Sequence, residues 1–154
     1  MTLRSFVIIE KENAYLLIRE SSARWKGQWY FPGGKLERYE DPVTAVIRET
    51  KEEAGCDVLV DGLFYFKYQK GFLCNKMNIY FHGRTNLPVV KTKLNEAVDL
   101  QWFTYEQLIG LPLREDALQV IDTYRALTAT LPIYSFNFVR HGQPHASQSN
   151  PNSI

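Results

Sequence analysis

Three glutamates in one short stretch have the spacing of a metal-binding helix face. Glu52 and Glu53 follow Glu49 by three and four positions. Because a helix turns about 100° per residue, all three side chains project from one side. Carboxylates this close repel one another unless a cation lies between them. Hard divalent ions such as Mg²⁺ or Mn²⁺ prefer oxygen clusters of this kind. The spacing therefore predicts a divalent metal site.

Two neighbouring features support that interpretation. The turn Gly33-Gly34 brings bare backbone near the same face, where its carbonyls could complete a coordination shell and a phosphate could approach closely. Arg48 could orient one of the glutamates. The alternative is that this face is ordinary solvated surface, as glutamate-rich helix faces usually are. The preceding Pro-Gly-Gly turn weakens that alternative.

The segment from Gly34 to Cys56 resembles the Nudix box, Gly-x5-Glu-x7-Arg-Glu-U-x-Glu-Glu-x-Gly-U, in which U is a bulky apolar residue. The two U positions hold Thr50 and Cys56, and Tyr39 stands where the family often has glycine. A match with correct spacing at every fixed position is far more specific than a lone glycine motif. The fixed positions are filled by Gly34, Glu40, Arg48, Glu49, Glu52, Glu53 and Gly55.

The resemblance implies an α/β/α sandwich with a mixed β-sheet between helices, and Mg²⁺- or Mn²⁺-dependent substitution at phosphorus. It implies that Glu52 and Glu53 are metal ligands and that Glu49 is a further ligand or a base. A backbone carbonyl of Gly33 or Gly34 would also bind metal, and Arg48 would hold a box glutamate in place.

Outside this core, the resemblance implies less. Structural or outer-shell roles are expected for Glu37 and Glu40. Many family members use one more acidic residue before a Trp-containing strand, and Glu96, six residues before Trp102, matches that placement. An ordinary loop acid is an equally good interpretation of Glu96.

The family resemblance predicts an enzyme that acts on phosphoric anhydride bonds of a small nucleotide. A MutT-like nucleoside di- or triphosphate pyrophosphohydrolase is the first choice, and an ADP-ribose or nucleotide-sugar pyrophosphatase is the second. A third hypothesis, from another class, is a regulatory domain that binds a nucleotide without hydrolysis. The intact box favours an enzyme.

Several residues are candidates for contacts with the rest of the substrate. Aromatic rings could stack on a base and basic side chains could meet phosphates, although core packing is the usual role of any one aromatic residue. The candidates are Arg19, Trp29, Phe31, Lys35 and Tyr80.

Composition sets the broad class. The 154 residues fit one domain, expected over residues 1–132, followed by an extension at 133–154 whose last part is expected to be disordered. With 18 basic and 17 acidic residues, the chain lacks the basic field of a nucleic-acid-polymer binder. The two cysteines, the absence of a leader pattern at the N-terminus and the lack of a long apolar run favour a cytoplasmic protein without membrane contact, as a monomer or homodimer.

Local patterns predict the elements that position the glutamates. Residues 5–9 and 14–19 form a predicted hairpin covered on both faces, and a short β segment at 29–31 stops at Pro32-Gly33-Gly34. Asp41 is the predicted N-cap of a helix that runs to Ala54, with Gly55 after its end. The core face of this helix is expected at Val43, Val46, Ile47, Thr50 and Ala54. Further strands are predicted at about 57–69, 74–84 and 98–103, then a short helix capped by Thr104 and Gln107, and a helix at 114–130.

A late motif, Arg140-His141-Gly142, resembles the opening of histidine phosphatases. Only 13 residues follow His141, too few for that domain. The motif is a chance match or part of a longer chain, and His141 is expected to be inert as a nucleophile here.

Overall fold

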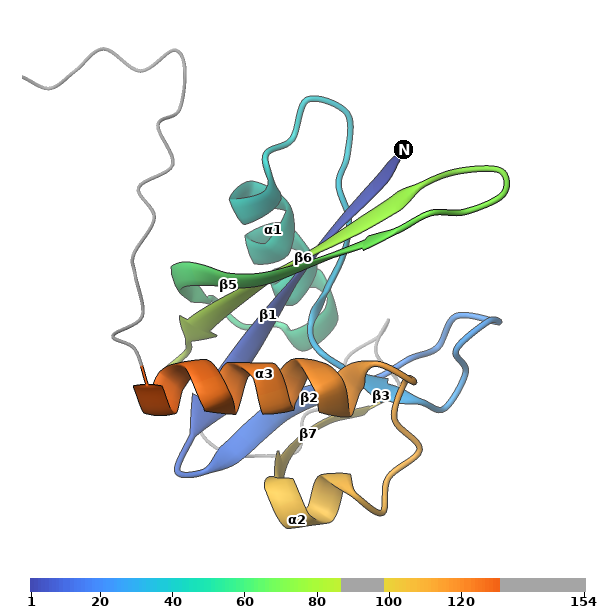
Figure 1. The fold of residues 1–154 in the computed structure, drawn as a ribbon. Helices are drawn as coiled ribbons and strands as arrows, with labels where there is room; N and C mark the ends of the chain where they lie inside the picture. Colours follow the sequence, from blue (N-terminus) through green and yellow to red (C-terminus); the bar gives the residue numbers. More distant parts are fainter. Residues whose placement is uncertain (87–98, 131–154) are drawn as a thin grey trace, which may run out of the picture.

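The structure is a computed structural model that describes residues 1–86 and 99–130. It contains seven β-strands and three α-helices in these ranges, arranged as a sheet between helices (Figure 1). The strands are β1 (Thr2–Lys11), β2 (Ala14–Arg19), β3 (Trp29–Tyr30), β4 (Gly33–Lys35), β5 (Leu59–Gln69), β6 (Lys76–Arg84) and β7 (Asp99–Thr104), and the helices are α1 (Pro42–Ala54), α2 (Tyr105–Leu108) and α3 (Ala117–Thr130). Residues 87–98 and 131–154, with Glu96 and His141, lie outside the described ranges.

Strand β1 is the centre of a mixed sheet. The order is β3-β2-β1-β6-β5, with β4 paired to β1 and β7 paired to β2. The pairing of β1 with β6 is parallel, and the other pairings are antiparallel. Both faces of β1 are buried because its side chains alternate between two cores.

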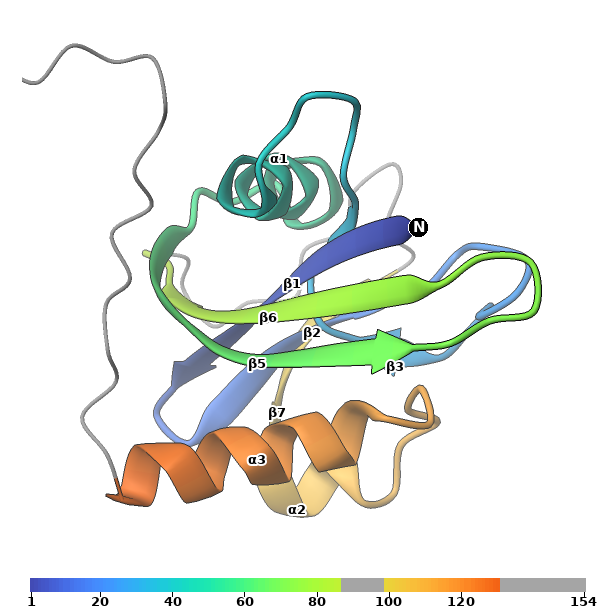
Figure 2. The same cartoon turned by 45° about the horizontal axis from the view of Figure 1, so that its top comes forward.

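Each face of the sheet is covered by one long helix. Phe6 and Ile8 pack into a core with Val120 and Ile121 of α3. Val7 and Ile9 pack on the opposite side, in a core that includes Val46 and Ala54 of α1. Figure 2 shows α1 above and α3 below the strands. The predicted helix–sheet–helix layering is therefore present.

Local capping fixes the ends of α1 as the sequence predicts. The Asp41 carboxylate accepts hydrogen bonds from the backbone N–H groups of Val43 and Thr44, both at 2.9 Å, and Pro42 occupies the first turn. Gly55 ends the helix in the left-handed conformation, with φ 63°. The capping box of Thr104 and Gln107 on α2 is also present.

The sequence analysis needs four corrections at this level. Residues 33–35 form strand β4 on β1, where a chain-breaking turn was expected. Strand β1 runs from Thr2 to Lys11, beyond the predicted 5–9, because β6 extends its pairing to Thr2 and β2 extends it to Lys11. Helix α3 starts at Ala117, three residues after the predicted start. Ile47 is 36% exposed on α1 and does not belong to the core.

Candidate metal and nucleotide site

The glycine turn and the glutamates of α1 are in direct contact. The backbone N–H of Gly33 donates a hydrogen bond to Glu53 Oε2 at 3.0 Å. A Cβ atom at Gly34 would lie 2.5 Å from Glu49 Oε1, so a side chain at that position would force this carboxylate to move. The structure thus brings together the two parts that the sequence analysis expected to meet.

Gly33 is required for a separate reason. Its φ is +137°, and a Cβ atom there would collide with the carbonyl oxygen of Ser5 on β1. The register of β4 on β1 pairs Ser5 with Gly34 and Phe6 with Gly33. The glycine turn is therefore held against the sheet by backbone pairing while its other side faces α1.

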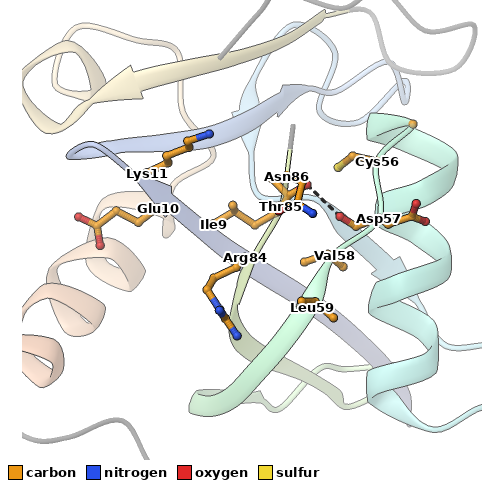
Figure 3. A pocket seen from close by; sticks show the side chains of 11 residues that line it. Ile9, Glu10, Lys11, Cys56, Asp57, Val58, Leu59, Arg84, Thr85 and Asn86 are labelled. Carbon is orange, nitrogen blue, oxygen red and sulfur yellow. Dashed lines mark hydrogen bonds between the residues drawn. The ribbon is translucent and has the colours of Figure 1, made fainter. Parts of the chain in front are cut away.

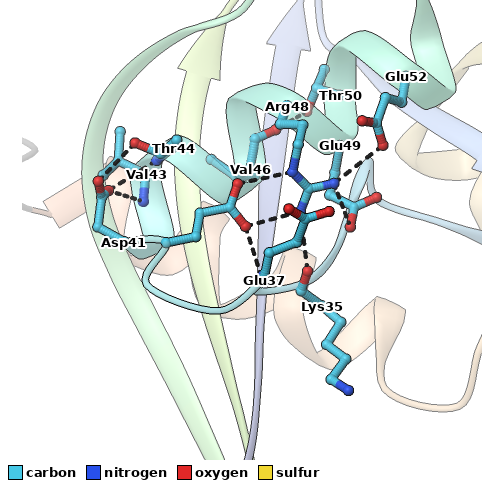
Figure 4. A network of polar contacts seen from close by, with 11 residues as sticks. Lys35, Glu37, Asp41, Val43, Thr44, Val46, Arg48, Glu49, Thr50 and Glu52 are labelled. Atoms are coloured by element: carbon cyan, nitrogen blue, oxygen red, sulfur yellow. Dashed lines mark hydrogen bonds and ion pairs between the residues drawn. The ribbon is translucent and has the colours of Figure 1, made fainter.

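Arg48 is the centre of an ion-pair network beside the glutamates (Figure 4). Its Nε and Nη2 atoms donate to the two carboxylate oxygens of Glu40 at 2.8 and 2.9 Å. Its Nη1 atom lies 3.2 Å from Glu49 Oε1 and 3.1 Å from Glu52 Oε2. Arg48 thus contacts two of the box glutamates; the resemblance implied that it holds one box glutamate in place.

Glu40 serves this network from the loop before the helix. Its carboxylate also accepts the backbone N–H of Glu37 at 2.8 Å, so it ties the loop to Arg48. The hydrogen bonds from Arg48 hold the pKa of Glu40 below its usual range. This geometry agrees with the structural role expected for Glu40.

The electrostatics around Glu53 favour a cation. The pKa of the Glu53 carboxyl is raised to about 8, mainly by burial; the hydrogen bond from Gly33 opposes this rise, and the nearby Glu49, Glu20 and Glu52 contribute to it. Burial also raises the pKa of Glu49, against the effect of Arg48. A positive ion between these side chains would reverse both shifts.

The chemistry of the donor atoms at this site therefore suits a hard divalent ion such as Mg²⁺ or Mn²⁺. The donor set consists of carboxylate oxygens from one helix next to the backbone of the glycine turn. Within residues 1–86 and 99–130, however, no three His, Cys, Asp or Glu side chains are already gathered as ligands of one ion. One reason is that the Glu52 carboxylate is turned toward Arg48.

Three predicted substrate residues are buried in the core. Trp29, Phe31 and Tyr80 are 6%, 1% and 0% exposed. Trp29 packs edge-to-face on Phe103, with ring centroids 4.8 Å apart, and Tyr80 stacks on Phe6 at 5.6 Å. These aromatic rings support the fold, so we do not assign them to base stacking.

The two predicted basic substrate residues lie at the surface. Arg19 pairs with Asp99 at 3.4 Å. Lys35 is exposed and its side chain points away from the network of Arg48 (Figure 4), to which it contributes only its carbonyl oxygen. Neither residue contacts a box glutamate through its side chain.

The sequence analysis missed a pocket of about 110 Å³ on the α3 side of the sheet. Arg114 and Asp116 line it and are only 7% and 8% exposed. The Arg114 guanidinium lies 3.7 Å from the Tyr30 ring centroid and pairs with Glu20 at 3.2 Å. Three consecutive charged residues at the start of a helix were the available signal, but such a run usually indicates solvent-exposed surface.

A larger open groove, of about 830 Å³, lies beyond the C-terminal end of α1 (Figure 3). Gly55, Cys56, Lys11 and Arg84 are among its lining residues. The Thr85 hydroxyl donates to the carbonyl oxygen of Asp57 at 2.8 Å across it. None of the box glutamates lines this groove, so it is separate from the candidate metal site.

Comparison with known proteins identifies the family. A model of the NUDIX domain matches residues 2–124. CTP pyrophosphohydrolase of Escherichia coli (strain K12) is 27% identical over 132 residues, which are 81% of this chain and 92% of that protein. Putative nudix hydrolase 1 of Caenorhabditis elegans is 41% identical over 68 residues, which are 39% of this chain and 18% of that protein. The 8-oxo-dGTP diphosphatase of Proteus vulgaris is 45% identical over 53 residues, 34% of this chain and 47% of that protein.

A NUDIX hydrolase from Nitrosomonas europaea superposes with a TM-score of 0.71 at 22% identity, covering 81% of this chain and 88% of that one. At this identity the likeness concerns the fold, and it confirms the predicted α/β/α class. The chain spans less than half the length of two of the three curated relatives named above. The names of the relatives agree with the prediction of an enzyme acting on phosphoric anhydride bonds. No helix in the described ranges is long and apolar enough to cross a membrane.

Proposed function

The chain belongs to the Nudix family, and we propose that it hydrolyses a phosphoric anhydride bond in a nucleoside di- or triphosphate with Mg²⁺ or Mn²⁺ as cofactor. The observation that carries this proposal is the contact between the glycine turn and the acidic face of α1. Gly33 bonds to Glu53 while Gly34 leaves room only for the carboxylate of Glu49. Two partly buried carboxylates beside a glycine turn are a donor set that suits a divalent cation.

In this proposal the box residues have separate tasks. Glu49, Glu52 and Glu53 would hold the cation, together with a backbone carbonyl of Gly33 or Gly34. When bound, the cation would neutralise charge on phosphate oxygens and lower the pKa of the attacking water. One of the glutamates accepts the proton of that water.

Arg48 is a positioning residue in this scheme. Its Nε and Nη2 atoms bind both carboxylate oxygens of Glu40, and its Nη1 atom contacts Glu49 and Glu52. We propose Glu96 as a further acidic ligand, on the resemblance alone. The two basic candidates, Arg19 and Lys35, would meet phosphates only after a movement of their exposed side chains.

The pocket of Arg114 and Asp116 gives the proposal a place for the nucleoside. Strand β1 pairs Arg4 with Asn78 of β6 on one side and with Lys35 of β4 on the other. Both Arg4 and Asn78 line the pocket, and β4 carries the glycine turn. The nucleoside and its phosphates would thus lie across neighbouring strands.

We further propose a cytoplasmic protein that takes a small nucleotide, binds no nucleic-acid polymer and acts as a monomer or homodimer. ADP-ribose or a nucleotide sugar is the second substrate candidate from the sequence. A purely regulatory nucleotide-binding domain is disfavoured because Arg48 and all three glutamates are present and in contact with their expected partners.

The test is a nucleotide panel with Mg²⁺, with ADP-ribose and a nucleotide sugar included and both products separated by chromatography. We expect Glu53→Gln to lower turnover by at least about a hundredfold and to leave the fold intact. Glu12→Gln, in the exposed β1–β2 turn, is the matched control. Cleavage by the Glu53→Gln protein at the wild-type rate would refute the role of the acidic face.

A further inference from the structure

The pocket on the α3 side of the sheet has the features of a built binding site. Its volume is about 110 Å³. Three buried polar side chains form its inner wall. Three basic residues also line it: Arg4 from β1, Lys76 from β6 and Arg24 from the β2–β3 loop. The inner residues are Asn78 on β6 and the pair Arg114 and Asp116 before α3.

We propose that this pocket holds a pyrimidine base, so that the substrate is a pyrimidine nucleoside di- or triphosphate. This inference rests on the proposed function. It narrows that function to one class of base, and two observations carry it: the hydrogen-bonding groups of the inner wall and the size of the partly open space that they line.

The inner wall offers more donors than acceptors. Arg114 Nε is buried without a hydrogen-bond partner among the described residues. The Asn78 amide, also in the lining, donates to the Tyr80 hydroxyl at 3.3 Å and has a second N–H for a ligand. The contacts that described residues make to the Asp116 carboxylate, from Tyr80 and Lys67 at 3.4 Å each, go to Oδ2. Its Oδ1 atom is thus the acceptor for a ligand.

A pyrimidine base matches this set. Its polar edge presents two acceptors and one N–H donor, in cytosine as in uracil, and the pocket presents guanidinium and amide donors beside one carboxylate oxygen. A phosphate group would suit the inner wall less well because Asp116 would repel it. The surplus of positive charge among the outer residues, Arg4, Arg24 and Lys76, suits the phosphates attached to the nucleoside.

The walls of the pocket are fixed by their own contacts. The Arg114 guanidinium lies between Tyr30 and Trp25, at 3.7 and 4.7 Å from the ring centroids. The Tyr80 hydroxyl, which contacts Asp116, lies 2.8 Å from the Tyr30 hydroxyl. Because these buried groups hold one another, the pocket does not widen easily.

This rigidity makes size a criterion of selection. A volume of about 110 Å³ suits a single six-membered heterocycle. A purine carries a second fused ring, and admitting it would require Arg114 to leave both aromatic rings and its ion pair with Glu20. Purine nucleotides, including oxidised ones, are therefore the expected poor substrates.

The experiment compares CTP, UTP, ATP, GTP and 8-oxo-dGTP by kcat/KM with Mg²⁺ and wild-type protein. We expect the two pyrimidine nucleotides to exceed each purine nucleotide by at least about tenfold, as a size-limited pocket discriminates. Calorimetric binding of the α,β-methylene diphosphates of cytidine and adenosine, which have no anhydride bond to cleave, should give the same order. Asp116→Asn should reduce the pyrimidine preference, whereas Glu12→Gln, in the exposed β1–β2 turn outside the pocket, should not.

The outcomes separate the two proposals. Cleavage of purine nucleotides at the same rate as pyrimidine nucleotides, or faster, would overturn the assignment of the pocket and leave the hydrolase proposal standing. An unchanged preference in a folded Asp116→Asn protein would also overturn it. If no nucleotide were cleaved, the hydrolase proposal would fail, and tighter binding of the cytidine analogue would still support the pocket.

Discussion

Replacing Gly34 by alanine would test the contact on which the metal site depends. The new Cβ atom would lie 2.5 Å from both Cδ and Oε1 of Glu49. Carbon and oxygen atoms at ordinary contact are about 1 Å farther apart, so the carboxylate must move by about that distance. Gly34 does not have a positive φ, and alanine fits its backbone without strain.

The expected loss is therefore catalytic. A displacement of about 1 Å at a reacting group costs about a hundredfold in rate, which corresponds to about 2.7 kcal/mol in the activation free energy. The free energy of unfolding should change by only about 1 kcal/mol, the cost of an altered rotamer at a half-buried glutamate.

Gly33→Ala supplies the contrast on the adjacent residue. Its Cβ atom would meet the carbonyl oxygen of Ser5, a backbone group in the middle of the sheet, at a φ of +137°. Backbone strain alone costs about 1–3 kcal/mol. We expect this variant to lose stability in urea denaturation, whereas Gly34→Ala keeps its stability and loses turnover.

The measurements are kcat at saturating Mg²⁺ and the unfolding midpoint in urea, with Gly110→Ala as a control. At Gly110 the nearest atom to an added Cβ is the Gln107 carbonyl oxygen at 4.0 Å, so neither quantity should change. A Gly34→Ala protein that turns over at the wild-type rate would show that Glu49 is not held at the reaction site. Unfolding of Gly34→Ala as severe as that of Gly33→Ala would show that the glycine serves the fold.

Three further predictions follow from the same contacts. Arg48→Lys removes the two-pronged bond to Glu40 and should raise the Mg²⁺ concentration for half-maximal activity at least about tenfold, since lysine cannot reproduce the fork; an unchanged Mg²⁺ titration would contradict its positioning role. Asp41→Ala should lower the free energy of unfolding by about 1 kcal/mol in urea because it removes the N-cap of α1, with Asp57→Ala, at an exposed ion pair with Lys51, as the milder comparison. Burial lowers the pKa of His82, so the neutral form is favoured in the folded protein and stability should fall as the pH drops below about 6.5; His82→Gln should flatten that fall between pH 7.5 and 5.5, and an equal slope in both proteins would assign it to other groups.

Helix α1 shows what local sequence can predict. Its first and last residues, its aspartate cap and its glycine stop were all expected, because each depends on neighbours within a few positions. The glutamate spacing likewise determines which carboxylates share a face. The position of the glycine turn near those carboxylates was also expected from the residues, and the contact is present.

Features that depend on distant partners were not predictable in this way. Strand β4 exists because Gly33 and Gly34 pair with Phe6 and Ser5, a relation that no local pattern contains. Tyr80 is an aromatic residue of a type that can stack on a base, but in the folded sheet it lies in the core. Its sequence position alone does not distinguish these two roles. Arg114 and Asp116 fell in the helix predicted at 114–130, and nothing in that pattern indicates that aromatic neighbours from the first 30 residues bury the arginine.

Strand β1 also fixes a length. It lies between β4, with the glycine turn, and β6, with Asn78, and adjacent strands are about 4.8 Å apart. The two ends of a ligand across these strands would therefore be separated by about 10 Å, a span set by main-chain hydrogen bonds that side-chain motion cannot stretch. A nucleotide with one phosphate more or fewer would present a different bond at the acidic face. The spacing of the strands would therefore determine which phosphoric anhydride bond is hydrolysed.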